Sequence, residues 1–134
     1  MPSNAPHSFP KQERLCSQRL TDALFAEGRR LMVFPYSVRW MPCPADLLPE
    51  GVRVQVLVAT SKRKFRHAVD RNRVKRLTRE CYRRQKGLLV EPLAARGRAM
   101  LVAVNYVHNV ILPYATLYGK MEKVLAALAK EAAK

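Results

Sequence analysis

The side chains best suited to chemistry in this sequence are the guanidinium and ammonium groups of one segment. Residues 61–86 carry 12 Lys and Arg residues but only two acids, Asp70 and Glu80, and so hold +10 of the chain's formal net charge of +15. Such groups bind phosphates, and Arg offers a planar fork of donors that matches a phosphate well. The concentration of charge therefore favours a surface that binds a polyanion, although a solvated charged helix face is the alternative.

A helix expected at 67–86 places most of these cations on one face. With 3.6 residues per turn, Val74, Leu77 and Cys81 form a narrow apolar stripe that must pack inward. The opposite face holds Asn72, Arg76, Arg79 and Arg83, flanked by Lys75 and Lys86 on one side and by Arg73 on the other. Arginines three and four residues apart repel one another, and we expect no carboxylate on this face to relieve them. Bound phosphates would do so.

The loop before this helix adds further cations at the helix start. These residues are Lys62, Arg63, Lys64 and Arg66. The start of a helix also offers unpaired N–H groups and the positive end of the helix dipole, both of which favour anions. Phe65, in the middle of the loop, either stacks on a nucleic-acid base or plugs the hydrophobic core.

Side chains that could cut a substrate are few and scattered. Asp70 and Glu80 lie about 15 Å apart along the expected helix and cannot share a metal ion. The three histidines are far apart in the sequence, so a two-histidine acid–base site would need long-range folding. The three cysteines lack metal-ligand spacing, and there is no glycine-rich phosphate loop. We therefore expect a binding protein with no catalytic residue and no metal site of its own.

The elements that position the basic helix form one small domain. Residues 1–10 hold three prolines and predict a flexible arm, residues 11–130 a single polyanion-binding domain, and residues 131–134 a tail. Ser17 is the expected N-cap of a helix at 18–26, which ends at Glu27 and Gly28. A second helix is expected from 113 or 114 to about 130, where apolar residues recur at helical spacing.

Three strands follow from alternating apolar residues. They are expected at 31–40, 52–59 and 99–105, with Pro35 marking an edge or a bulge in the first. Segments 41–51 and 87–97 hold prolines and are expected to be a loop and a connector, and a further short strand is possible within 41–51 or 107–112. The order α-β-β-(β)-α-β-α predicts an α+β fold, a small sandwich of helices packed on a central sheet of about four strands.

Composition excludes several classes of protein. A hydrophobic fraction of 49% is too high for a disordered chain, and no run of 18 apolar residues could span a membrane. The N-terminus has no charged-then-apolar leader typical of secretion. We therefore expect a cytoplasmic protein with no membrane partner.

The helix region resembles a known motif. Residues 68–80 read AVDRNRVKRLTRE, similar to the RNR motif of the bacterial ribonuclease P protein component, in which Ala precedes Arg-Asn, Lys-Arg and a further Arg at fixed spacing. The resemblance extends upstream to a valine-rich strand that leads into Thr60-Ser61-Lys62-Arg63. It also includes Phe9-Pro10-Lys11, followed by Arg14-Leu15, near the N-terminus. Similarity thus covers most of the chain, from about residue 9 to 128.

This resemblance implies an RNA-binding subunit of a ribonucleoprotein that removes the 5′ leader from precursor tRNA. It implies a left-handed β-α-β crossover, and partners that are the ribonuclease P RNA subunit and precursor tRNA, with no stable protein partner. The RNA subunit would carry the active site and its Mg²⁺, so the protein alone would be inactive. The residues that match the motif, and would contact the RNA subunit or lie beside the substrate path, are Arg71, Asn72, Lys75, Arg76 and Arg79.

The leader would lie in a cleft between sheet and helices. At the position of one family aromatic on the first helix this chain has Thr21, whereas Phe25 retains the second. Phe34 and Tyr36 are further candidates to stack on a single strand, or else they pack in the core. Two alternatives remain for the basic helix: a structural RNA-binding protein of the ribosomal or assembly type, and a DNA-binding protein with the helix in the major groove.

Overall fold

The computed structural model describes residues 9–134, and within them four strands form one mixed sheet. The sheet order is β1-β2-β4-β3, and the strands are β1 (Arg29–Val33), β2 (Tyr36–Cys43), β3 (Val54–Thr60) and β4 (Ala99–Tyr106). The helices are α1 (Gln18–Glu27), α2 (Ala68–Gln85), α3 (Gly87–Ala95) and α4 (Tyr114–Ala132), with short 3-10 turns η1 (Lys11–Glu13) and η2 (Ala45–Leu47). The predicted α+β fold is confirmed.

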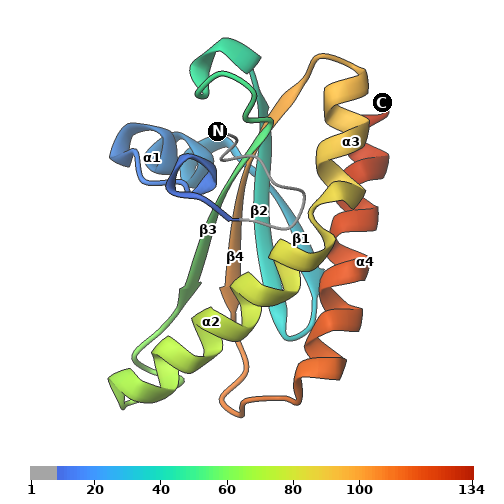
Figure 1. The fold of residues 1–134 in the computed structure, drawn as a ribbon. Helices are drawn as coiled ribbons and strands as arrows, with labels where there is room; N and C mark the ends of the chain where they lie inside the picture. The colour runs from blue at the N-terminus through green and yellow to red at the C-terminus, as the bar shows by residue number, and fades with distance from the viewer. Residues whose placement is uncertain (1–8) are drawn as a thin grey trace.

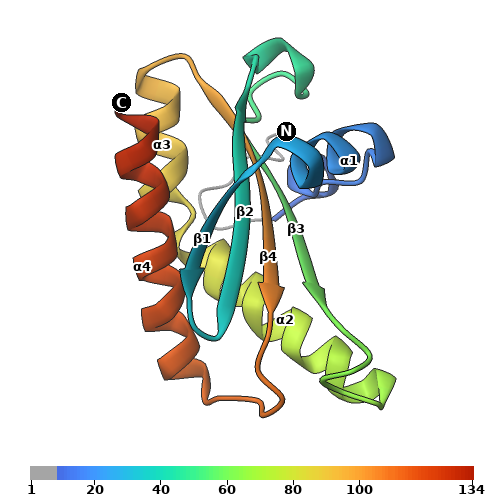
Figure 2. The ribbon, with the colours of Figure 1, turned by 180° about the vertical axis from the view of Figure 1, so that it is seen from behind.

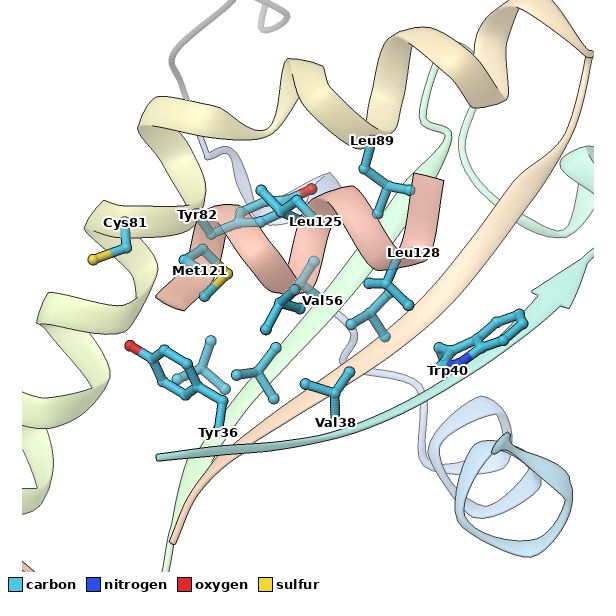
Figure 3. Close-up of a cluster of buried hydrophobic side chains, with 14 of the residues drawn as sticks. Tyr36, Val38, Trp40, Val56, Cys81, Tyr82, Leu89, Met121, Leu125 and Leu128 are labelled. Atoms are coloured by element: carbon cyan, nitrogen blue, oxygen red, sulfur yellow. The ribbon is translucent and has the colours of Figure 1, made fainter. Parts of the chain in front are cut away.

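Helices cover the two faces of the sheet unequally. The cluster on one face joins Val38 of β2 and Val56 of β3 to buried residues of α2, α3 and α4 such as Leu128. On the other face Leu24 of α1 packs on Leu101 and its neighbours, and within residues 9–134 no other helix covers that face (Figures 1 and 2). Figure 3 shows the larger cluster between the sheet and the helices. The sheet therefore presents one fully packed face and one partly open face.

The connection between β3 and β4 has an uncommon hand. These strands are parallel neighbours, and α2 and α3 connect them across the packed face. In Figure 1 both strands point down, α2 lies in front of the sheet and β4 lies to the right of β3, which makes the crossover left-handed. Most such crossovers are right-handed. Phe9 and Arg14 of the N-terminal segment lie beside the outer face of α2.

The strand expected at 31–40 is two strands. β1 and β2 pair antiparallel with Val33 opposite Tyr36, so the chain reverses at Phe34 and Pro35. Pro35 has no N–H to donate to a sheet ladder, and it lies in the turn rather than at an edge or bulge position. This division gives the sheet its fourth strand, whereas the sequence suggests a further short strand within 41–51 or 107–112.

The connector expected at 87–97 is largely helix α3. Leu89 and Leu93 lie four residues apart and are both buried in the main cluster. Their burial offsets the cost of Pro92, which lacks the N–H of a regular helical hydrogen bond. Helix α4 likewise continues to Ala132, where Arg98 donates to the carbonyls of Ala132 and Lys134, at 2.8 and 2.6 Å.

The main core predicts a clear contrast between two leucines. Leu128 is fully buried in α4, so Leu128→Ala should lower the free energy of unfolding by about 2–5 kcal/mol. Leu88, 45% exposed in α3, is the control, and Leu88→Ala should change it by about 0.5 kcal/mol or less. Urea denaturation followed by circular dichroism measures both. Equal losses in the two variants would contradict the packing described here.

Candidate nucleic-acid interface

Helix α2 presents the two faces predicted from its sequence. Val74, Thr78 and Cys81 are buried, and Leu77 is half-buried against the same cluster. Asn72, Arg73 and Arg76 are exposed on the outer side, whereas Arg71, Lys75, Arg79 and Arg83 are partly buried. The outer face is therefore basic over several turns.

The loop that leads from β3 into α2 carries exposed cations around a buried ring. Lys62, Arg63, Lys64 and Arg66 are exposed. Phe65 is 7% exposed, with its ring 6.0 Å from that of Tyr106, so it is a core plug and is not available to stack on a base. Among the described residues no side chain caps the N-terminus of α2, which directly follows the cationic loop along the chain.

Two expectations for the charge on α2 are wrong. Glu80 accepts hydrogen bonds from Arg83 and from Arg84, the latter at 2.9 Å, so this turn of the helix does contain a carboxylate. These hydrogen bonds lower the pKa of Glu80 to about 2. Lys86 does not flank the basic face, because its side chain is buried and its Nζ lies 2.7 Å from Oε1 of Glu13.

The N-terminal segment is fastened to the core beside α2. Besides the Glu13–Lys86 ion pair, Leu15 N–H donates to the Val56 carbonyl at 3.0 Å. The rings of Phe9 and Tyr82 meet edge to face at 5.4 Å. The expected flexible arm at 1–10 falls mostly outside the described residues, but Phe9 is partly buried against the main cluster.

This arrangement forms a pocket of about 470 Å³ between the N-terminal segment and the outer face of α2. Its lining residues are Phe9, Arg14, Asn72, Arg76, Arg79, Glu80 and Arg83. The Arg14 guanidinium lies over the Phe9 ring, 5.2 Å from its centroid. Burial, and to a smaller extent the nearby charge of Arg14, lower the pKa of Arg79. The one carboxylate among the lining residues, Glu80, is already paired with Arg83 and Arg84.

Sequence reasoning missed Phe9 and Arg14 as members of this site. Both fall within the N-terminal part of the motif resemblance, which was the available signal. Helix periodicity could not find them, because it relates only residues on one helix. The pocket therefore joins a basic face that was predicted to two residues that were not.

The three aromatic residues expected to stack on single-stranded RNA differ in their exposure and in their position in the fold. Phe25 is 47% exposed at the end of α1, and Arg39 donates to its carbonyl at 2.8 Å with its guanidinium 5.8 Å from the ring. Phe34 is 52% exposed in the β1–β2 turn, 5.0 Å from the ring of His108. Tyr36 is fully buried with its hydroxyl 3.1 Å from that of Thr78, so it packs in the core and cannot stack on RNA.

Phe25 and Phe34 lie at opposite ends of the β1–β2 hairpin. Arg39, which contacts Phe25, pairs with Arg30 near the open end of the hairpin, and Phe34 follows Val33 at its turn. The alternation of β1 packs the partly buried Leu31 and Val33 against the main cluster, so Arg30 and Met32 face the partly open side of the sheet. That side therefore carries an aromatic group and two arginines.

Over residues 9–134, no group of three or more His, Cys, Asp or Glu side chains is placed to hold a metal ion. In the same range no helix has the length and apolar character to cross a membrane. The site that the structure does offer is the pocket and the basic face around it.

Comparison with known proteins gives consistent matches. A family model described as Ribonuclease P matches residues 9–129. The chain is 33% identical over 129 residues to the ribonuclease P protein component of Porphyromonas gingivalis strain ATCC 33277, covering 96% of this chain and 92% of that one. It is 39% identical over 99 residues to that of Chlorobium phaeobacteroides, covering 74% of this chain and 67% of that one.

Solved structures share the fold. The ribonuclease P protein from Thermotoga maritima superposes with a TM-score of 0.66 at 20% identity, covering 86% of this chain and 96% of that one. The Staphylococcus aureus ribonuclease P protein superposes with a TM-score of 0.62 at 16% identity, covering 86% and 94%.

The buried ion pair beside the pocket predicts an asymmetric response to mutation. Glu13→Leu or Lys86→Met alone breaks the ion pair while the other charged side chain stays buried, and should lower the free energy of unfolding by about 3–5 kcal/mol. The double variant Glu13→Leu/Lys86→Met removes both charges and should be more stable than either single variant. Thermal and urea unfolding measure these values. A double variant that loses the sum of the two single losses would contradict a buried pair.

Proposed function

Because the chain belongs to the ribonuclease P protein family, we propose that it binds the catalytic RNA subunit of ribonuclease P and the 5′ leader of precursor tRNA. In this role it assists removal of the leader by an active site that the RNA subunit carries. The observation that supports the proposal is the pocket between Arg14 and the outer face of α2. The alternative of a structural ribosomal or assembly protein is left to the test.

The RNA subunit is the partner proposed for the basic loop and α2. Arg76 is exposed and Arg79 lines the pocket, and both present guanidinium groups suited to backbone phosphates. The repulsion between neighbouring positive charges in the free protein is reduced when phosphates lie between them. Binding should thus be strongly dependent on salt, because each phosphate contact releases counterions.

The precursor tRNA leader is proposed to cross the partly open face of the sheet. Proteins that bind single strands combine aromatic rings with a positively charged surface, and this face offers Phe25 with Arg39 and Arg30. Phe34, at the far end of the hairpin, would contact a longer leader. As the resemblance to the family implies, the Mg²⁺ ions that act in cleavage would be bound by the RNA subunit.

The direct test is reconstitution. Purified protein alone should cut nothing, and the protein with its cognate RNA subunit should mature the 5′ end of precursor tRNA at a low Mg²⁺ concentration that leaves the RNA alone inactive. Gel analysis of end-labelled precursor measures cleavage. If protein addition changes nothing while RNA recovered with the protein from cells is ribosomal, the structural alternative replaces the proposal.

A second test addresses the basic face. Arg76→Ala and Arg79→Ala should each weaken binding to the RNA subunit and reduce the slope of log K against log salt by about 1, because each removes a phosphate contact. Arg96→Ala, at an exposed position after α3, is the control and should leave the slope unchanged. Filter binding across a salt series gives the slopes. An unchanged slope in the Arg76 and Arg79 variants would contradict the orientation of α2.

A further inference from the structure

Arg71, the first arginine of the motif, is directed toward the protein. Its Nη1 donates to the carbonyl of Phe65 at 2.9 Å and to the carbonyl of Arg66 at 3.0 Å. Both acceptors belong to the basic loop that precedes α2, and the Arg71 side chain is partly buried between that loop and the helix. A guanidinium engaged in this way has fewer donors left for a phosphate.

The loop that Arg71 holds is also ordered from its other end. The amides of Lys64 and Phe65 donate to the Ser61 carbonyl, at 3.2 and 3.3 Å, and the Lys64 amide lies 3.3 Å from the Ser61 hydroxyl. The Phe65 ring is buried. Between these fixed points, the cations of Lys62, Arg63, Lys64 and Arg66 remain exposed.

Other arginines of the same helix differ from Arg71. Arg73 and Arg76 are exposed, and within residues 9–134 neither donates a hydrogen bond to the protein or pairs with a carboxylate. Their guanidinium groups are therefore wholly available for a partner. The motif thus contains arginines in two different situations, which its spacing alone does not distinguish.

Resting on the proposed function, we propose that Arg71 is a positioning residue that orders the basic loop for the RNA subunit. It clamps two loop carbonyls to the first turns of α2, so that the cations of residues 62–66 meet the RNA backbone in one arrangement. Ordering the loop before binding removes part of the entropy cost that binding would otherwise carry. Arg71 then contributes to affinity through the loop more than through a phosphate of its own.

The first arm of the test uses the free protein and does not depend on its RNA partner. Arg71→Gln should speed amide hydrogen exchange at Lys64 and Phe65, while the core amides of β4 keep their protection and report an intact fold. Arg76→Gln is the matched control and should leave the loop amides unchanged. Unaltered loop exchange in folded Arg71→Gln protein would overturn the proposal.

The second arm measures binding to the RNA subunit in two backgrounds, wild type and a triple variant with Lys62, Arg63 and Lys64 replaced by Gln. In wild type, Arg71→Gln should reduce the salt slope by about 2 or more, against about 1 for Arg76→Gln. In the triple variant, Arg71→Gln should weaken binding less than two-fold, while Arg76→Gln keeps its full effect.

An equal loss from Arg71→Gln in both backgrounds, with a slope change of about 1, would show a direct phosphate contact and overturn the positioning role. If the wild-type protein does not bind the RNA subunit at all, the proposed function fails. The exchange experiment on the free protein still decides whether Arg71 orders the loop.

Discussion

The ion pair between Glu13 and Lys86 connects parts of the molecule that are far apart in sequence. Lys86 is the residue at which α2 ends and α3 begins, and Glu13 ends the short turn η1. Because both side chains are buried, neither charge can be solvated if the other moves away. The N-terminal segment is therefore held against α2, and that contact brings Arg14 and Phe9 to the pocket.

Two groups of cations in this structure differ in what they contact. Arg71, Arg98 and Arg39 donate to backbone carbonyls, and Arg83 and Arg84 pair with Glu80, so these five stabilise the fold or a local segment. Arg73, Arg76 and the exposed cations of the basic loop have no such partner within residues 9–134. Like charges left close together destabilise the free protein and favour a bound polyanion. At this surface, closely spaced positive charges lower the stability of the free protein but strengthen its binding to a polyanion.

The sequence predicted most of α2 because helix periodicity is a local property. Val74 and Cys81 are buried and Asn72 and Arg76 exposed, as the spacing requires. Lys86 was placed wrongly because its partner, Glu13, lies 73 residues away and no local pattern records that distance. For the same reason, local patterns did not place Arg14 and Phe9 in the candidate site. At Phe34 and Pro35, continuous alternation concealed a reversal of the chain, and at α3 the burial of Leu89 and Leu93 outweighed the signal of Pro92.

Helix α2 is anchored at both ends, by the Phe65 plug and Arg71 at its start and by Lys86 at its finish. Both ends of the helix are held in position, because the Phe65 ring is packed in the core and Lys86 is a buried charge. A single residue inserted between them would rotate everything beyond it by about 100° relative to the start of the helix. Arg76 and Arg79 would then leave the pocket while the buried stripe turned outward. The length of this helix is therefore constrained by the fold, in addition to any constraint that binding places on its exposed side chains.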